Sequence, residues 1–209
     1  DQFDLYHGPV DQLQTFDDTL ATMYGFLDAN PTETLIVSVK EEEAAYQATL
    51  TFEQLFTQYV QQHPEKWSLG TATPDLGDVR GTIQLLRRFD ADTPVGIDGH
   101  PAIWTDNATF DIATTIHVED EYMVTDNALK WAAITRAFGQ AVADSDPATL
   151  YLTFTSGYQT VMGLPNIAIV SDVIDPMLDT YLATANGRLG IAIMDFVTAA
   201  RAQAVIATN

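Results

Sequence analysis

The stretch NPTETLIVSVK, residues 30–40, decides the fold class. Asn30 and Pro31 end a preceding apolar stripe of helical spacing, and LIVSVK, residues 35–40, follows as a continuous β-prone run. A strand that is apolar on both faces is typical of a parallel sheet covered by helices. The order of helix, short loop and buried strand therefore favours an α/β fold.

The same alternation continues along all 209 residues. Thr15 with Asp18, and Thr51 with Gln54, have the spacing of helix capping boxes. Strands are expected at residues 3–6, 35–40, 82–89, 114–120, 151–156 and 189–196, and helices at 13–27, 51–60, 127–143, 173–182 and in an alanine-rich tail. Because a (β/α) barrel closes with about eight strands, six strands predict a barrel whose first one or two β/α units precede Asp1.

Composition narrows the function. A formal net charge of −20 argues against nucleic acid as a partner and against general adsorption to anionic lipid, so any lipid contact is expected to be local and apolar. No apolar run approaches the roughly 18 residues of a membrane span. Cysteine is absent, which excludes disulfides and thiolate sites. The acidic, lysine-poor surface suits a secreted protein that works in acid and also a protein from salty surroundings, and of the two we expect secretion.

Polar side chains follow the predicted strands, where the chemistry of such folds collects. Three of only nine basic residues, one lysine and two arginines, lie there, which suggests an anionic ligand such as phosphate. The residues at the predicted strand ends are His7, Lys40, Arg87, Arg88, Asp120, Tyr122, Ser156 and Asp195.

Several of these residues can also be explained by structural roles instead of a role in a site. His7 alone fits a turn residue, and Lys40 heads the acidic run 41–43, where a solvated ion pair is the simpler role. Arg87 and Arg88 are adjacent on a strand, so at most one of them points toward a site. Asp195, in the apolar frame IAIMDF, is expected to need a partner such as a histidine. We read His63, His100 and His117 as structural.

Motifs for metal, nucleotide and serine-nucleophile chemistry are missing: the sequence contains no HExxH, P-loop, GxGxxG or GxSxG. Among the reaction types considered, the one that remains is acid–base catalysis by histidine on a phosphate ester, with lysine and arginine stabilising charge.

Taken in order, seven segments resemble bacterial-type phosphatidylinositol-specific phospholipase C. They are LYHGP, TFDDTLATMYGFLDANPTETLIVSVKEE, LGDVRGTIQLLRRF, WTDNATF, VEDEY, LYLTFTS and LGIAIMDF. The resemblance implies a distorted (β/α)8 barrel in which residues 1–209 form the C-terminal three quarters of one catalytic domain. It also implies cleavage of phosphatidylinositol to diacylglycerol and a cyclic inositol phosphate, without metal or other cofactor.

The resemblance also implies roles for six residues. His7 matches the general acid that protonates the leaving diacylglycerol oxygen, and Asp195 matches the carboxylate that orients the general-base histidine. Lys40, Arg88 and Asp120 match residues that bind the inositol ring, and Tyr122 matches the aromatic residue on which the ring stacks. The family's base and its phosphate-binding arginine precede the strand of His7 and match nothing here.

That departure leads to further expectations. We expect residues 1–209 alone to show little or no turnover and the complete enzyme to be a secreted monomer acting on phosphatidylinositol headgroups at a membrane surface. SGYQTVMGLPNIAIV, residues 156–170, differs from the family's rim. Two alternatives remain open: a non-catalytic barrel that binds an inositol phosphate or glycolipid headgroup, and a metal-dependent glycerophosphodiesterase.

Overall fold

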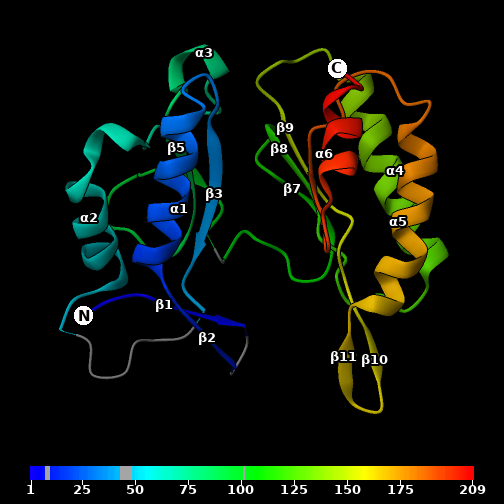
Figure 1. Cartoon of the computed structure of the whole chain (residues 1–209), viewed down its shortest axis with the longest axis horizontal. Coiled ribbons are helices and arrows are strands. Elements are labelled where there is room, and N and C mark those ends of the chain that lie inside the picture. Colours follow the sequence, from blue (N-terminus) through cyan, green and yellow to red (C-terminus); the bar gives the residue numbers. More distant parts are fainter. Residues whose placement is uncertain (8–9, 43–48, 101) are drawn as a thin grey trace. The chain divides into compact units, whose positions relative to one another are not determined.

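The computed structural model describes residues 1–7, 10–42, 49–100 and 102–209, and of His7 it describes the backbone but not the side chain. The chain forms two compact units, Asp1–Ile103 and Trp104–Asn209. Figure 1 shows the elements of each. Each unit is an α/β structure and is described by itself; that residues 1–209 form a single domain stays a prediction.

The first unit is built around β5, which pairs in parallel with three other strands. Strand β3 pairs along the whole of one edge of β5, while β4 and β6 share the other edge, β4 at its start and β6 near its end. The elements are β1 (Asp4–His7), β2 (Val10–Thr15), α1 (Phe16–Ala29), β3 (Leu35–Lys40), α2 (Phe52–Gln62), η1 (Pro64–Lys66), β4 (Trp67–Ser68), α3 (Leu76–Val79), β5 (Ile83–Arg88) and β6 (Ile97–Asp98).

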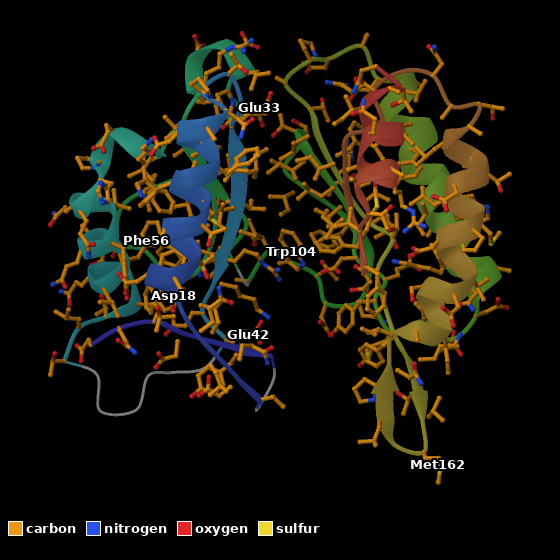
Figure 2. The ribbon with its side chains drawn as sticks, viewed as in Figure 1. Asp18, Glu33, Glu42, Phe56, Trp104 and Met162 are labelled. Carbon is orange, nitrogen blue, oxygen red and sulfur yellow. The ribbon has the colours of Figure 1, made fainter. Side chains whose placement is uncertain are left out.

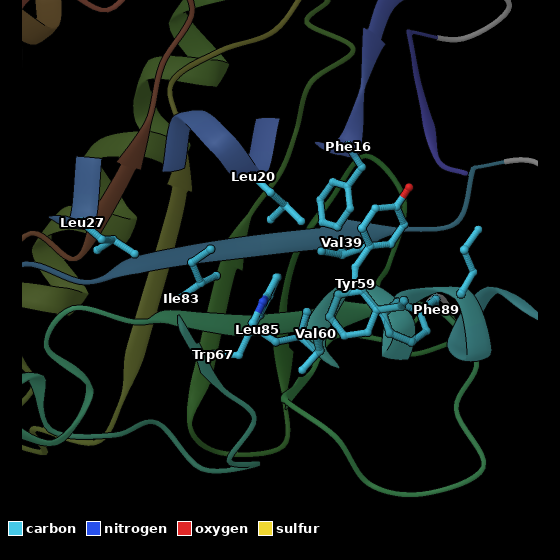
Figure 3. Close-up of a cluster of buried hydrophobic side chains, with 12 residues drawn as sticks. Phe16, Leu20, Leu27, Val39, Tyr59, Val60, Trp67, Ile83, Leu85 and Phe89 are labelled. Carbon is cyan, nitrogen blue, oxygen red and sulfur yellow. The ribbon is translucent and has the colours of Figure 1, made fainter. Parts of the chain in front are cut away.

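Helices α1 and α2 cover one face of this sheet. Their apolar stripes supply Leu20 and Phe56, among others, to a core that also contains Val39, Ile83 and Leu85 from the strands. Figure 3 shows this cluster. Because side chains alternate along a strand, residues 36, 38, 40, 84, 86 and 88 belong to the other face. The predicted parallel strand at 35–40 is therefore confirmed, but burial on both faces is not: one face joins the core, and on the other Ile36 is 37% exposed.

Both predicted capping boxes are present. Thr15 Oγ1 accepts from Asp18 N at 3.2 Å, and Thr51 Oγ1 accepts from Gln54 N at 3.2 Å. Helix α1 therefore begins at Phe16, which corrects the placement of Leu13 on the helical stripe. Leu13 precedes the cap, lies in β2 and is 90% exposed.

The second unit has a sheet in the order β12-β9-β8-β7, with all pairs parallel except β7 with β8. Helices α4, α5 and α6 lie on one side of it (Figure 1). The elements are β7 (Thr109–Ile112), β8 (Ile116–Glu119), α4 (Asn127–Ala143), β9 (Leu150–Phe154), β10 (Gln159–Val161), β11 (Leu164–Asn166), α5 (Ala168–Leu182), β12 (Ile191–Ile193) and α6 (Ala199–Ile206).

Three features differ from the sequence-based expectation. The first strand does not join a parallel sheet: β1 pairs antiparallel with β2, with His7 opposite Val10. Strand β7 adds an antiparallel edge to β8. Residues 159–166 form an antiparallel hairpin, β10–β11, whose two turn residues, Met162 and Gly163, have φ of 50° and 82°. Positive φ at both turn positions is the geometry of a tight type I′ turn.

Across the described ranges, no helix combines the length and apolar character that crossing a bilayer requires.

Candidate active site

Two predicted cations meet at the carboxyl end of the first unit's sheet. Lys40 is the last residue of β3 and Arg88 the last of β5, and the parallel register places them opposite each other. They belong to the sheet face that α1 and α2 leave uncovered. Two positive charges on adjacent strands attract an anionic or oxygen-rich ligand.

The neighbouring Arg87 has a structural role. Its guanidinium donates to Val95 O at 3.2 Å and to Phe89 O, and its Nη2 lies 2.6 Å from Asp98 Oδ1. The side chain is 9% exposed. Arg87 thus belongs to the fold, and Arg88, which the resemblance matches to an inositol-binding residue, belongs to the face opposite the core.

Gly99 lies directly against Arg88. A Cβ on Gly99 would come 3.3 Å from Arg88 Cγ and 3.1 Å from Leu86 Cδ1. The residue after β6 therefore packs tightly on the aliphatic part of the Arg88 side chain, which is half-buried. This packing restricts the rotamers open to Arg88.

Lys40 carries the ion pair that its sequence context suggested. Its Nζ lies 2.7 Å from Glu42 Oε1, with the two side chains 39% and 52% exposed. Glu42 is labelled in Figure 2. Such an exposed pair is held weakly, so it does not prevent Lys40 from binding a ligand oxygen. Next to it, burial raises the pKa of Glu41, with Asp90 adding to the effect.

His7 ends β1, and its side chain lies outside the described part of the chain. The other histidines have partners. His100 pairs with Asp90 and accepts at Nδ1 from Ala102 N at 3.0 Å, so both ring nitrogens are used. His117 pairs with Asp111 and stacks on Tyr151, with centroids 4.6 Å apart. These contacts agree with the structural reading of both residues.

In the second unit, Trp104 fixes Asp120. The carboxylate follows β8 and accepts from Trp104 Nε1 at 2.9 Å, while Asp120 N donates to Ala108 O at 3.0 Å. Trp104 is buried and also contacts the ring of Phe110, with centroids 5.4 Å apart. The indole therefore orients one carboxylate oxygen of Asp120.

The segment after Trp104 also holds Tyr122. Tyr122 Oη donates to Asp106 Oδ1 at 2.8 Å, and this hydrogen bond, with burial second, raises the pKa of Tyr122 to about 12. Asn107 Oδ1 accepts from Met123 N at 2.7 Å. Trp104, Asp106 and Asn107 were not predicted as functional residues; the quoted segment WTDNATF was the only signal, because its partners lie about 16 residues away along the chain.

Asp195 lies two residues beyond β12 and is half-buried. Its Oδ2 accepts a hydrogen bond from the backbone N–H of Gly157 at 3.2 Å. Gly157 also lies against the backbone of Tyr122. The second unit therefore gathers Asp195 and Tyr122 around one loop, and Asp120 precedes Tyr122 by two residues.

A buried ion pair supports the end of β8 from the helix side. Lys130 Nζ lies 2.7 Å from Glu119 Oε1, and the side chains are 1% and 0% exposed. Burial raises the pKa of Glu119, and Lys130 opposes that shift. Glu119 Oε2 and Thr153 Oγ1, on residues paired across β8 and β9, make no hydrogen bond. The pair anchors α4 to the strand that leads into Asp120.

Each unit thus presents polar groups at the carboxyl end of its own parallel strands. The first unit offers cations, and the second offers carboxylates and aromatic rings. Cations suit phosphate, carboxylates accept from sugar hydroxyls, and a ring suits the face of a polyol. Among the residues that the structure describes, no three His, Asp or Glu side chains gather as a metal-ligand group.

No family model matches the chain. It is 28% identical over 187 residues to a 1-phosphatidylinositol phosphodiesterase of Staphylococcus aureus strain Newman; the alignment covers 82% of this chain and 59% of that protein. A protein of the same name from S. aureus strain NCTC 8325 is also 28% identical. The chain therefore spans a little under 60% of the length of the curated relatives that it matches.

Solved structures give the same result for the fold. A phosphatidylinositol-specific phospholipase C from S. aureus has a TM-score of 0.86 and 24% identity, over 99% of this chain and 74% of that one. The enzyme from Listeria monocytogenes has a TM-score of 0.75 and 22% identity, over 99% and 74%. These likenesses confirm the α/β fold expected from the resemblance, that of a distorted (β/α)8 barrel. The chain is thus similar in sequence to 1-phosphatidylinositol phosphodiesterases and in fold to bacterial phosphatidylinositol-specific phospholipases C.

Proposed function

We propose that the protein is a phosphatidylinositol diacylglycerol-lyase. The observation that carries the proposal is the similarity to 1-phosphatidylinositol phosphodiesterase over 187 residues, a stretch long enough to include most of the residues at the strand ends. The arrangement of those residues supports it, because cations, carboxylates and a tyrosine lie where parallel strands end.

The proposed reaction is an intramolecular transfer at phosphorus. The inositol 2-hydroxyl oxygen forms a bond to phosphorus, and the bond from phosphorus to the glycerol oxygen breaks. A histidine base oriented by Asp195 takes the hydroxyl proton, and His7 gives a proton to the leaving oxygen. Nucleophile and phosphorus belong to one molecule, so the products are diacylglycerol and a cyclic inositol phosphate.

Lys40 and Arg88 would bind inositol oxygens from the first unit. Their register pairing supports this role, and so does the separate use of Arg87 as a structural residue. The Glu42 partner of Lys40 accepts hydrogen bonds and so suits a ring hydroxyl beside the ammonium group.

Asp120 and Tyr122 are proposed to bind the inositol ring. Trp104 donates to Asp120 and orients its carboxylate, a group that accepts hydrogen bonds from hydroxyls. Asp106 holds the Tyr122 phenol, and with its pKa raised to about 12 the ring stays neutral at physiological pH. A neutral aromatic face suits the C–H side of inositol.

We also propose that the substrate is taken from a lipid surface, and that the β10–β11 hairpin touches it. Met162, at the hairpin tip (Figure 2), is 98% exposed and Leu164 is 70% exposed. Because the net charge is −20, an apolar contact suits this chain better than attraction to anionic lipid. A secreted monomer fits the acidic, cysteine-free composition.

Phosphorus NMR tests the lyase proposal. The full-length protein is added to phosphatidylinositol micelles in chelator, beside the His7→Ala and Asp195→Asn variants and a Gly139→Ala control. Gly139 lies in α4 with open space around its Cα. We expect a cyclic inositol phosphate signal from wild type and control that falls by about 10²- to 10⁴-fold in the two variants.

Two results would contradict the proposal. Binding of inositol phosphate without turnover by the wild type would favour a headgroup-binding protein. Cleavage that requires added divalent metal and gives an acyclic phosphate would favour the metal-dependent diesterase.

A further inference from the structure

The loop after the central strand β9 connects the segments that follow both neighbouring strands. Thr155 N donates to Ile193 O at 2.8 Å, at the end of β12. Tyr158 N donates to Tyr122 O at 2.8 Å, and Val124 N donates to Tyr158 O at 2.9 Å, beyond the end of β8. Residues 155–158 therefore bind to both sides, and Gly157 lies between these two sets of hydrogen bonds.

Gly157 has no room for a side chain. A Cβ there would lie 2.9 Å from Tyr122 O, 2.9 Å from Val124 Cγ2 and 3.4 Å from Tyr122 Cα. Two of these atoms belong to the backbone of Tyr122, which the hydrogen bond from Tyr158 also holds. A methyl group would therefore move the loop or the Tyr122 backbone, because neither contact can be relieved by a rotamer change.

The N–H of Gly157 is directed at the Asp195 carboxylate. It donates to Oδ2 at 3.2 Å, which leaves the remaining acceptor positions of the carboxylate open to another donor. A hydrogen bond from a fixed backbone N–H to a half-buried carboxylate fixes the plane of that carboxylate. A carboxylate held in one plane can set the tautomer and the orientation of a histidine base.

We propose that Gly157 is a positioning residue of the active site. Its N–H donates a hydrogen bond that holds Asp195 in place. Because Gly157 has no side chain, its backbone can lie against the backbone of Tyr122 without moving that N–H away from Asp195. The proposal rests on the proposed lyase function, because the consequence of losing the geometry is a slower proton transfer to the base that Asp195 orients. Gly157 itself touches no substrate.

The test joins kinetics with NMR on the full-length protein. Gly157→Ala is expected to lower kcat about 10- to 100-fold, because a displacement of this order at a catalytic group has that effect, while KM changes less. Gly139→Ala, a glycine-to-alanine change in open space, is expected to leave both constants unchanged.

A double-mutant cycle separates positioning from general damage. If Gly157 acts through Asp195, adding Gly157→Ala to Asp195→Asn lowers kcat by less than about threefold further. If Gly157→Ala acts only on folding, its fold-decrease in kcat and that of Asp195→Asn multiply in the double variant. Such multiplied decreases in kcat, with melting temperatures that fall in step with activity, would overturn the proposal.

An amide readout tests the hydrogen bond without any turnover. In nitrogen–proton correlation spectra, the Gly157 N–H signal is expected to move in Asp195→Asn, which replaces its acceptor, while the Gly139 signal stays in place. An unmoved Gly157 signal would overturn the positioning role even in an active enzyme. No cleavage by the wild type would instead overturn the lyase proposal, whatever the Gly157 amide does.

Discussion

Lys40 and Arg88 end adjacent parallel strands in matching register, so two cations face the same side of the first unit's sheet. Arg87, one residue before Arg88, belongs to the opposite face and bonds to Phe89 O, Val95 O and Asp98. The two consecutive arginines thus lie on opposite faces of the sheet, because side chains alternate along β5.

This separation predicts opposite effects for two neighbouring substitutions. Arg88→Ala should lower kcat/KM for phosphatidylinositol by about 10- to 100-fold and lower the free energy of unfolding by only about 1 kcal/mol, for the packing that is lost against Gly99. Arg87→Met should instead lower the free energy of unfolding by about 2–3 kcal/mol, because the carbonyls of Phe89 and Val95 lose a buried donor. Steady-state kinetics and urea unfolding check both variants. Equal effects on stability would contradict the assignment.

The Lys130–Glu119 pair predicts a pH-dependent loss of stability. Lys130→Met leaves a fully buried carboxylate without its cation and should cost about 3–5 kcal/mol at pH 7. Burial raises the pKa of Glu119, so the folded protein holds this proton more readily than the unfolded chain, and the cost of the charged form grows as pH rises. The deficit should therefore shrink on acidification toward pH values near the ordinary range of glutamate.

Urea unfolding of wild type and Lys130→Met at several pH values measures this. Lys66→Met is a suitable control, since Lys66 pairs with the largely exposed Asp28. A Lys130→Met deficit that is the same at every pH would show that Glu119 does not take up a proton.

The Tyr122 ring predicts a graded response. Tyr122→Phe keeps the aromatic face and removes only the bond to Asp106, so we expect a rise in KM of about two- to fivefold. Tyr122→Ala removes the face as well and should raise KM about tenfold or more. Kinetics on a soluble, short-chain phosphatidylinositol measure ring binding without the lipid surface. Equal losses in the two variants would place the role in the hydroxyl group instead.

The hairpin predicts a defect confined to lipid surfaces. Met162→Asp and Leu164→Asp should weaken binding to zwitterionic vesicles about tenfold, because each removes an exposed apolar side chain and adds charge. Activity on the soluble substrate should stay unchanged. Ile206→Asp is the matched control, since Ile206 is 63% exposed at the end of α6, an element that follows the hairpin by more than 30 residues. A vesicle defect in Ile206→Asp as large as in Met162→Asp would show that the added charge alone causes the defect.

Local patterns predicted much of the fold. The capping residues Thr15 and Thr51 act within one helical turn, and the strand at 35–40 follows from its own composition, so both were visible in the sequence. The β1–β2 pairing and the antiparallel edge strand β7 were not, because pairing partners and direction are set by the tertiary fold.

The candidate site divides in the same way. Lys40, Arg88, Asp120 and Asp195 were identified because a polar residue after an apolar strand is a local signal. Their partners were not. Trp104 and Gly157 reach Asp120 and Asp195 across 16 and 38 residues, and neither has a local pattern that marks it as a hydrogen-bond donor to a carboxylate. The sequence therefore does not reveal the hydrogen-bond donors that orient each candidate carboxylate, because these donors are distant along the chain.

The tip of the β10–β11 hairpin carries a conformational cost of its own. Met162 has φ of 50° in a turn where asparagine or glycine is the low-energy choice, and left-handed backbone costs an ordinary side chain about 1 kcal/mol. Met162→Asn would therefore make the turn more stable. The turn therefore gives up some backbone stability at residue 162, and in return an apolar thioether side chain is exposed at the hairpin tip.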